Sequence, residues 1–350
     1  MKKLICLCLL LVLALSGCGK TPVPSQTAEP AMTSQPPGVT PEPGVSPRPV
    51  RTEEPDATEV VINPGEWELP GTLRMPQGDG PFPCVVFVPT SDRDETTGNQ
   101  TLYRDLADDL AGLGIASIRY DNRTKIYSDK MDGDVNITVA EETVDDAVHA
   151  AKLAASTENI DSAKVFVAAH GLGGYLIPRI AAADAEDIIA GYIGLAAHAR
   201  PIMTVYLAEL DYSLSLGDGM TEEQKASVRA SFAEMAKAVS DLTEADRGSD
   251  KLVSGYFPTF WLDLAGYDPL AEAKKIDKPL FFLQGEHDYK VTMADFDMWK
   301  AAVPEAAFLP YPGLTHMFTK TEAMGSPADY ENDVRVDKAV AASIAEFAKK

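Results

Sequence analysis

The feature that most constrains the fold of this chain is a regular alternation of short apolar runs with segments of helical period. Each apolar run is six to eight residues long and almost continuously hydrophobic, as expected of parallel strands that are buried on both faces. Strands that alternate with helices predict a mostly parallel central sheet with helices on both faces, which is an α/β fold. The predicted strands are residues 83–88, 115–120, 164–169, 190–197, 279–284 and 306–311.

The segments around these strands carry apolar residues at helical spacing. Their stripes predict helices within residues 102–113, 144–151 and 336–347. The earlier stretch EWELPGTLRMP, residues 66–76, predicts an antiparallel arm at the edge of the sheet.

Residues 199–275 break the alternation and predict a helical cap inserted into the domain. This insertion contains a polar helix at about residues 221–242 and an aromatic-rich stretch, residues 255–267. The alternative is a packed helical excursion with no role in binding. The aromatic side chains hint at an apolar pocket, but core packing explains them better; they are Tyr256, Phe257, Phe260 and Trp261.

The first residues of the chain predict an export signal. Two lysines precede an apolar run over residues 4–15, which is too short for a membrane-spanning helix, so we expect a signal peptide over residues 1–17. Residues 15–18, LSGC, resemble the lipobox of bacterial lipoproteins, which implies cleavage before Cys18 and a lipid on its sulfur. An ordinary signal with a chance cysteine is the alternative. The resemblance therefore implies an extracytoplasmic protein that is anchored to the bacterial cell membrane through Cys18.

A proline-rich segment follows the predicted signal. Ten of the 25 prolines lie within residues 21–58, where large apolar residues are almost absent. Such a composition cannot bury enough surface to offset the entropy of ordering, so residues 18–58 are predicted to form a disordered tether. The remaining residues, 59–350, suit one large α/β domain.

The charge and cysteine content exclude several classes of function. The formal net charge is −22, whereas nucleic-acid binding needs clustered lysines and arginines, so no nucleic-acid partner is expected. Cys84 is the only cysteine beyond Cys18, and it lies in a predicted strand, where it should be a small buried hydrophobe. No metal-ligand cluster, phosphate loop or dinucleotide fingerprint occurs, so no metal or cofactor is expected. The oligomeric state is left open.

Three loops that follow predicted strands carry the candidate chemistry. Parallel α/β sheets place functional groups at the carboxyl ends of their strands. Gly171 follows one predicted strand, Asp288 follows another, and His316 follows the last. Hydrolase triads in this kind of fold have a fixed order along the chain, in which the strand–turn element comes first, the Asp second and the His last. Taken singly, the Asp could be a helix cap and the His ordinary polar surface.

Several motifs together resemble the α/β-hydrolase superfamily, and within it a bacterial group of esterases and acyl-aminopeptidase-like proteins. The resemblance implies an α/β-hydrolase fold and hydrolysis of a carboxylic ester or related acyl ligand. It implies that Asp288 orients His316, that His316 is the general base, and that the Leu172 amide is one oxyanion donor. The matching phrases are LPGTLRMP, DRDETTGN, RYDNRT, AAHGLGGYLIPRIA, YDPLAEA, LQGEHDYKVT and GLTHMF.

The chain departs from this family in two places. Gly171 stands where the family has its serine nucleophile, so a covalent acyl-enzyme on that atom cannot form. In addition, the family usually has His-Gly-Ser-Gly-Pro before its DRDE motif, whereas this chain reads VPTS. That loop would supply the second oxyanion amide, here from Thr90 or Ser91. A lost donor typically costs about 3 kcal/mol of transition-state stabilisation.

Glycine also has a conformational consequence at this position. In such a fold the nucleophile position lies in a sharp turn between a strand and a helix, called the elbow, which here is the turn at Gly171. The residue at the elbow has a positive φ, which glycine adopts with little penalty. Gly173 and Gly174 are expected where the following helix passes close to the strand. Pro178 lies inside that helix and predicts a kink.

Two functions remain open on these residues. One is a membrane-anchored carboxylesterase-like hydrolase of weak activity, with water activated by His316 and Asp288, or with Thr90 or Ser91 as an unorthodox nucleophile. The other is a non-catalytic pseudo-esterase that binds a small acyl or ester-type ligand or another partner outside the cytoplasm. Whether the chain is an enzyme at all is therefore left undecided.

Overall fold

A computed structural model describes residues 57–90, 96–97, 100–217, 219–331 and 333–350. The predicted signal peptide, Cys18, the tether up to residue 56 and Ser91 lie outside the described residues. The chain divides into Met1–Glu54 and Pro55–Lys350, and everything below concerns the second part.

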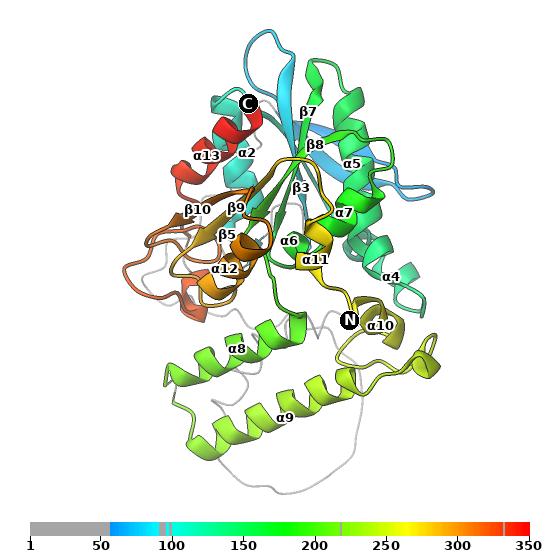
Figure 1. Ribbon diagram of the computed structural model, residues 1–350, viewed down its shortest axis with the longest axis vertical. Coiled ribbons are helices and arrows are strands. Elements are labelled where there is room, and N and C mark those ends of the chain that lie inside the picture. The colour runs from blue at the N-terminus through cyan, green and yellow to red at the C-terminus, as the bar shows by residue number, and fades with distance from the viewer. Residues whose placement is uncertain (1–56, 91–95, 98–99, 218, 332) are drawn as a thin grey trace, which may run out of the picture. The chain divides into compact units, whose positions relative to one another are not determined.

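The second part is built on an eight-stranded sheet and a set of mostly short helices (Figure 1). The strands of the sheet are β1 (Ala57–Ile62), β2 (Leu69–Arg74), β3 (Phe82–Val88), β6 (Ala116–Tyr120), β7 (Ile160–His170), β8 (Ile189–Leu195), β9 (Leu280–Gly285) and β10 (Ala307–Tyr311). A separate pair is β4 (Thr96–Thr97) and β5 (Gln100–Thr101). The α-helices are α2 (Leu102–Gly112), α3 (Arg123–Ile126), α4 (Ser128–Met131), α5 (Asp145–Ser156), α6 (Leu172–Tyr175), α7 (Ile177–Ala183), α8 (Ile202–Ser215), α9 (Glu222–Ser240), α10 (Pro258–Leu264), α11 (Pro269–Ala273), α12 (Met293–Ala302) and α13 (Lys338–Lys349). A π-helical turn, Ala140–Val144, precedes α5, and 3₁₀ turns lie at Glu244–Asp246 and Pro327–Glu331.

The sheet has the mixed topology that the sequence predicts. Its strand order is β1-β2-β6-β3-β7-β8-β9-β10. From β6 to β10 every neighbouring pair is parallel, whereas β1 and β2 are antiparallel to each other and β2 is antiparallel to β6. The prediction of a mostly parallel sheet with an antiparallel arm at its edge is thus confirmed.

Side-chain alternation along the central strands explains why helices cover both faces. In β3, Cys84, Val86 and Val88 point into one core cluster, and Val85 and Phe87 point into the other. All five are fully buried, and each large apolar side chain buried in this way contributes about 1.5–3 kcal/mol. Helices α2 and α13 contribute to the second cluster, and α5, α7 and α12 contribute to the first. Figure 1 shows α2 and α13 on one side of the sheet and α5 and α7 on the other.

Cys84 behaves as the sequence predicts. It is fully buried in the centre of β3, and burial raises the pKa of its thiol far above the ordinary range. A thiol held in this way is neither a nucleophile nor a metal ligand at neutral pH.

Three element boundaries differ from the expectations. Strand β1 begins at Ala57, two residues before the predicted start of the domain, because it pairs along its whole length with β2. The strand predicted over residues 190–197 ends at Leu195, because the next residue, Ala196, turns the chain at φ 45°. Strand β7 begins earlier than predicted, at Ile160.

The predicted cap is present as helices α8, α9 and α10. Figure 1 shows α8 and α9 side by side, away from the sheet. Helix α9 begins after Thr221, whose hydroxyl accepts from the Gln224 amide while the Gln224 side chain accepts from the Thr221 amide; this reciprocal pair fixes the start of the helix. The insertion ends earlier than predicted, because Leu270 and Ala273 of α11 pack into the core of the main domain.

The aromatic stretch of the cap is packed core, as expected. Phe260 and Trp261 are buried, and the Tyr256 ring stacks on Phe260 with centroids 4.1 Å apart. This cluster includes Tyr175 and Leu176, so it lies directly against the helix that follows Gly171.

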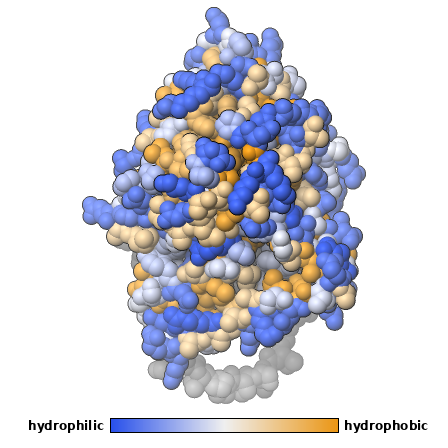
Figure 2. All heavy atoms as spheres, viewed as in Figure 1, coloured by the Kyte–Doolittle hydropathy of each residue, from blue (hydrophilic) through white to orange (hydrophobic). Residues whose placement is uncertain are grey.

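The visible surface is mostly hydrophilic. Figure 2 shows hydrophilic residues over much of the visible face, with hydrophobic residues showing between them. Among the described residues, no helix is both long and apolar enough to cross a bilayer.

Candidate active site

The candidate residues meet at the carboxyl ends of five neighbouring parallel strands. Thr90 follows β3, Gly171 follows β7, and His198 follows β8. Asp288 follows β9 and His316 follows β10. This edge of the sheet is where open α/β folds carry their ligands.

Gly171 forms a sharp turn between β7 and α6. Its φ is 54° and its ψ is −115°, which confirms the predicted positive φ. Two hydrogen bonds to the end of β8 and the loop after it fix the turn. The Gly171 amide donates to Leu195 O at 2.9 Å, and the Gly171 carbonyl accepts from His198 N at 3.2 Å. A residue with a side chain at this φ carries a strain of about 1–3 kcal/mol, which glycine avoids.

A lack of room for a side chain does not explain the glycine at this turn. A Cβ at position 171 would have as its nearest neighbours His316 Nε2 at 3.6 Å and His198 Nε2 at 3.9 Å, which are ordinary van der Waals distances. Gly174 is different, because a Cβ there would overlap Ala197. Close packing therefore requires Gly174, as predicted, whereas position 171 has room for a side chain.

The proline after this turn interrupts the helix rather than kinking it. Helix α6 ends at Tyr175, α7 begins at Ile177, and Pro178 lies in the first turn of α7. Proline is well tolerated there, because the first amides of a helix have no intrahelical acceptor.

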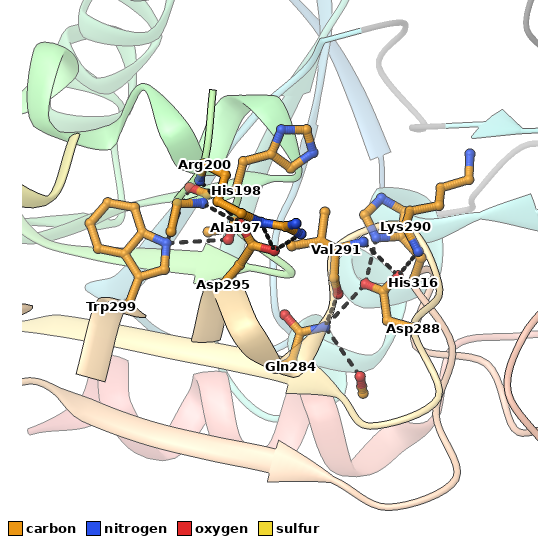
Figure 3. Close-up of polar contacts among 12 residues, drawn as sticks. Ala197, His198, Arg200, Gln284, Asp288, Lys290, Val291, Asp295, Trp299 and His316 are labelled. Atoms are coloured by element: carbon orange, nitrogen blue, oxygen red, sulfur yellow. Dashed lines mark hydrogen bonds and ion pairs between the residues drawn. The ribbon is translucent and has the colours of Figure 1, made fainter. Parts of the chain in front are cut away.

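Asp288 and His316 form a buried hydrogen-bonded pair. His316 Nδ1 lies 2.7 Å from Asp288 Oδ2, and the two side chains are 10% and 0% exposed (Figure 3). Asp288 Oδ2 also accepts from Gln284 Nε2 at 3.1 Å, while Oδ1 accepts from the amides of Lys290 and Val291 at 2.8 and 3.0 Å. The carboxylate is thus held from several sides, and it fixes the His316 ring with Nε2 turned toward Gly171.

Asp288 has a second role besides holding the histidine. Its bonds to the Lys290 and Val291 amides close the turn after β9, but the helix that follows starts at Met293, with Thr292 as its N-cap. Asp288 is therefore not the cap of that helix, which was the alternative interpretation of this residue.

Burial sets the protonation of the pair. It raises the pKa of Asp288 to about 7, while the Val291 and Lys290 amides, the Gln284 side chain and the nearby His170 act in the opposite direction. Burial lowers the pKa of His316 well below 6.5, and the charge of Lys290 adds to this effect. His316 is therefore neutral near pH 7. With Nδ1–H donated to Asp288, the Nε2 lone pair is free to accept a proton beside Gly171.

The predicted oxyanion donors are only partly described. Leu172 is the first residue of α6, and the first amides of a helix point outward without intrahelical partners. Thr90 lies next to this helix, since its Cγ2 is 3.4 Å from the position of a Cβ on Gly173. Ser91 lies outside the described residues, so its predicted role stays a prediction.

Two further histidines surround Gly171 and were missed in the sequence. His170 precedes the turn; its Nε2 lies 3.0 Å from His316 O, and the two rings are 4.3 Å apart. His198 brings Nε2 toward the same point from the loop after β8. Both rings are buried, which lowers the pKa of His170 well below 6.5 and that of His198 to about 4. The rule that functional groups follow parallel strands would have found His198, which directly follows the predicted strand over residues 190–197.

This histidine cluster is not a ready metal site. Across the part of the chain that the structure describes, no three His, Cys, Asp or Glu side chains are grouped so that they could hold a metal ion. The chemistry available is that of a neutral base on a carboxylate, beside a turn without a side chain.

Comparison with known proteins agrees with this fold and identifies a family. The family described as "Serine aminopeptidase, S33" matches residues 98–322, a range that contains Gly171, Asp288 and His316. Esterase EstD of Thermotoga maritima is 32% identical over 288 residues, which is 81% of this chain and 66% of that protein, slightly less than two thirds of its length. Solved structures share the fold at low sequence identity. Est1E from Butyrivibrio proteoclasticus has a TM-score of 0.51 at 16% identity, covering 83% of this chain and 96% of its own. An esterase from Pyrobaculum calidifontis has a TM-score of 0.50 at 17% identity, covering 83% and 86%.

Proposed function

Because this chain belongs to the serine aminopeptidase S33 family of α/β-hydrolases, we propose that it is a membrane-tethered, esterase-like protein that hydrolyses an ester slowly through water. The ester bond is suggested by the similarity to Esterase EstD. The slow, water-based route follows from the site, which has a base but no side chain to acylate.

The single observation that carries this proposal is the position of His316 beside the turn at Gly171, a residue without a side chain. His316 Nε2 lies 3.6 Å from where a Cβ of residue 171 would be, so its lone pair faces the space of a serine hydroxyl. A water molecule in that space can lose a proton to His316 and attack an ester carbonyl directly. Sites of this kind without a nucleophile retain about 10³–10⁴-fold acceleration over water.

The test is hydrolysis of p-nitrophenyl acetate by the wild-type protein and two variants. We expect a rate above buffer that is lost in His316→Ala and survives in Gly171→Ala, because alanine adds no nucleophile and leaves the outer part of the space open. His149→Ala is the matched control, since this half-buried histidine bonds to Asp145 O on α5, far in sequence from the site loops. A fluorophosphonate probe should not label the wild type; labelling of Ser91 or Thr90 would replace the water mechanism with an unorthodox nucleophile.

A binding function is the second candidate, and Gly171 itself favours it. Without a nucleophile the site can hold an acyl or ester ligand between Leu172 and His316 without consuming it. No rate above buffer, together with saturable binding of a non-hydrolysable phosphonate ester, would establish this function and reject the first.

The membrane tether is proposed from residues outside the described part of the chain. Its support is the LSGC sequence ending at Cys18 and the proline-rich segment that follows. Expression in a bacterium with radiolabelled palmitate should label the wild type but not Cys18→Ser. Equal labelling of both would contradict anchoring at this residue.

A further inference from the structure

His198 is a buried side chain beside the site that neither the Asp288–His316 pair nor the core packing accounts for. It is 6% exposed, and its Nε2 lies 3.9 Å from the position of a Cβ on residue 171. Its Nδ1 has no hydrogen-bond partner among the residues that the structure describes. Burying an imidazole in this way is unfavourable unless its other nitrogen is used.

The loop that carries His198 is held rigidly (Figure 3). Trp299 Nε1 donates to the carbonyls of Ala197 and His198, each at 3.2 Å. The fully buried Asp295 accepts from the Ala199 amide at 3.0 Å and pairs with the Arg200 guanidinium at 2.6 Å. Together with the bond from His198 N to Gly171 O, these contacts fix the backbone that carries the ring relative to the turn at Gly171. This degree of support is typical of a side chain whose direction matters.

The two imidazoles that face the elbow offer opposite hydrogen-bonding groups. His316 gives its Nδ1–H to Asp288, so its Nε2 is an acceptor. His198 is neutral at pH 7 and has one N–H. The tautomer with its proton on Nε2 leaves the buried, unpartnered Nδ1 as an acceptor and places the N–H beside the turn at Gly171, where a water oxygen can accept it. One donor and one acceptor therefore point at the same small space.

We propose that His198 positions the attacking water of this site. The water oxygen accepts from His198 Nε2–H and one water proton is donated to His316 Nε2, in the space that a serine hydroxyl would take. A hydroxyl group is the chemical group that satisfies this donor and acceptor together. This inference rests on the proposed function and adds a positioning residue to it.

The reaction that follows is balanced without a cofactor. His316 Nε2 takes a proton from the water, whose oxygen forms a bond to the ester carbonyl carbon and gives a tetrahedral oxyanion. Collapse of the oxyanion breaks the bond to the alcohol oxygen, and His316 returns the proton to that oxygen. The sum is an ester and water giving a carboxylic acid and an alcohol. His198 remains neutral throughout and moves no proton.

The test compares two substitutions of His198 in two backgrounds. His198→Gln keeps an N–H donor near the position of Nε2, and His198→Met keeps the volume without a donor. With Gly171 present, we expect His198→Met to lower kcat by about 10- to 100-fold, as for other losses of reactant positioning, with KM little changed and with His198→Gln retaining most of the rate. His149→Met is the matched control for loss of a histidine away from the site.

The Gly171→Ser background separates positioning from folding. There the hydroxyl is attached to the chain, so the loss from His198→Met should be much smaller than with Gly171. Equal losses in both backgrounds, or a loss in His198→Gln as large as in His198→Met, would show that His198 only supports the loop and would overturn the inference.

A second readout does not depend on turnover. Long-range ¹H–¹⁵N spectra of the imidazoles should show His198 as the Nε2–H tautomer and His316 as the Nδ1–H tautomer. If the wild type shows no His316-dependent hydrolysis, the proposed function fails, and the tautomers alone decide whether His198 offers a donor to this space. A His198 ring protonated on Nδ1 would overturn the inference whatever the rate.

Discussion

The two halves of the candidate site differ in how completely they are built. The acid–base half is a buried, fully hydrogen-bonded pair in which Asp288 receives four donors and His316 faces the elbow. The nucleophile half consists of a sharp turn with glycine at its tip and of the loop that contains Thr90. The first half is joined by side-chain hydrogen bonds, whereas the second is defined by the conformation of its backbone.

This difference teaches that a retained pair is not by itself evidence of catalysis. Asp288 also closes the turn after β9 through the Lys290 and Val291 amides, so its loss would leave buried groups unpaired. A serine at residue 171 offers the fold nothing comparable and carries the strain of a positive φ. The fold thus has its own reason to keep the acid–base half, and activity alone would maintain a serine at the elbow.

The largest expected effect comes from adding a serine hydroxyl at residue 171. Gly171→Ser should raise kcat on p-nitrophenyl acetate by about 10²–10⁴-fold, because the serine hydroxyl would lie beside His316 Nε2. The measurement is steady-state hydrolysis, with fluorophosphonate labelling of Ser at that position. No gain in a folded variant would mean that the Thr90 loop, and not the absence of a hydroxyl alone, limits the site.

The next effect probes the acid–base half in the repaired protein. In the Gly171→Ser background, Asp288→Asn should lower kcat by about 10²–10⁴-fold, because an amide holds the His316 ring in the wrong tautomer. Circular dichroism of the variant checks that the turn after β9 still folds. A loss below tenfold would indicate that His316 does not depend on Asp288 for its orientation.

A smaller effect concerns stability and pH. The pKa of His198 is about 4 in the folded protein, below its ordinary 6.5, so the unfolded chain binds more protons between these values. The stability that His198 contributes is therefore present above pH 6.5 and is lost as pH falls toward 4. Relative to His198→Gln, the wild-type free energy of unfolding should fall by about 3 kcal/mol over this window, as measured by urea denaturation at each pH. A constant difference would contradict a buried neutral imidazole.

The smallest effect concerns Lys290, whose charge contributes to the low pKa of His316. Lys290→Met should leave hydrolysis near pH 7 within about twofold, because the imidazole is already neutral there. The acidic limb of the pH–rate profile should move to higher pH, since removing a nearby positive charge raises the pKa of a histidine. A shift to lower pH would show that other charges dominate at His316.

The sequence predicts the sheet well because its strands are buried on both faces and so appear as continuous apolar runs. It also predicts the site loops, since position after a strand is enough to bring Gly171, Asp288 and His316 to one edge. The same rule applies to His198, which follows a predicted strand, but its link to the turn at Gly171 is a backbone bond between loops distant in sequence, which the sequence does not reveal. The interruption of the helix at Leu176 could not be predicted from the sequence either, because an isolated proline predicts a disturbance of a helix but not where the helix starts again.

The bend at Gly171 is held by the amide and the carbonyl of the residue at its tip, which bond to Leu195 and His198. Every residue has this amide and this carbonyl, so the two hydrogen bonds do not depend on the side chain, although a side chain adds the strain of the positive φ. A single substitution at this position can therefore place a hydroxyl in an already prepared backbone frame. The same independence makes the position a natural place to install a foreign reactive group, such as a thiol, without redesigning what surrounds it.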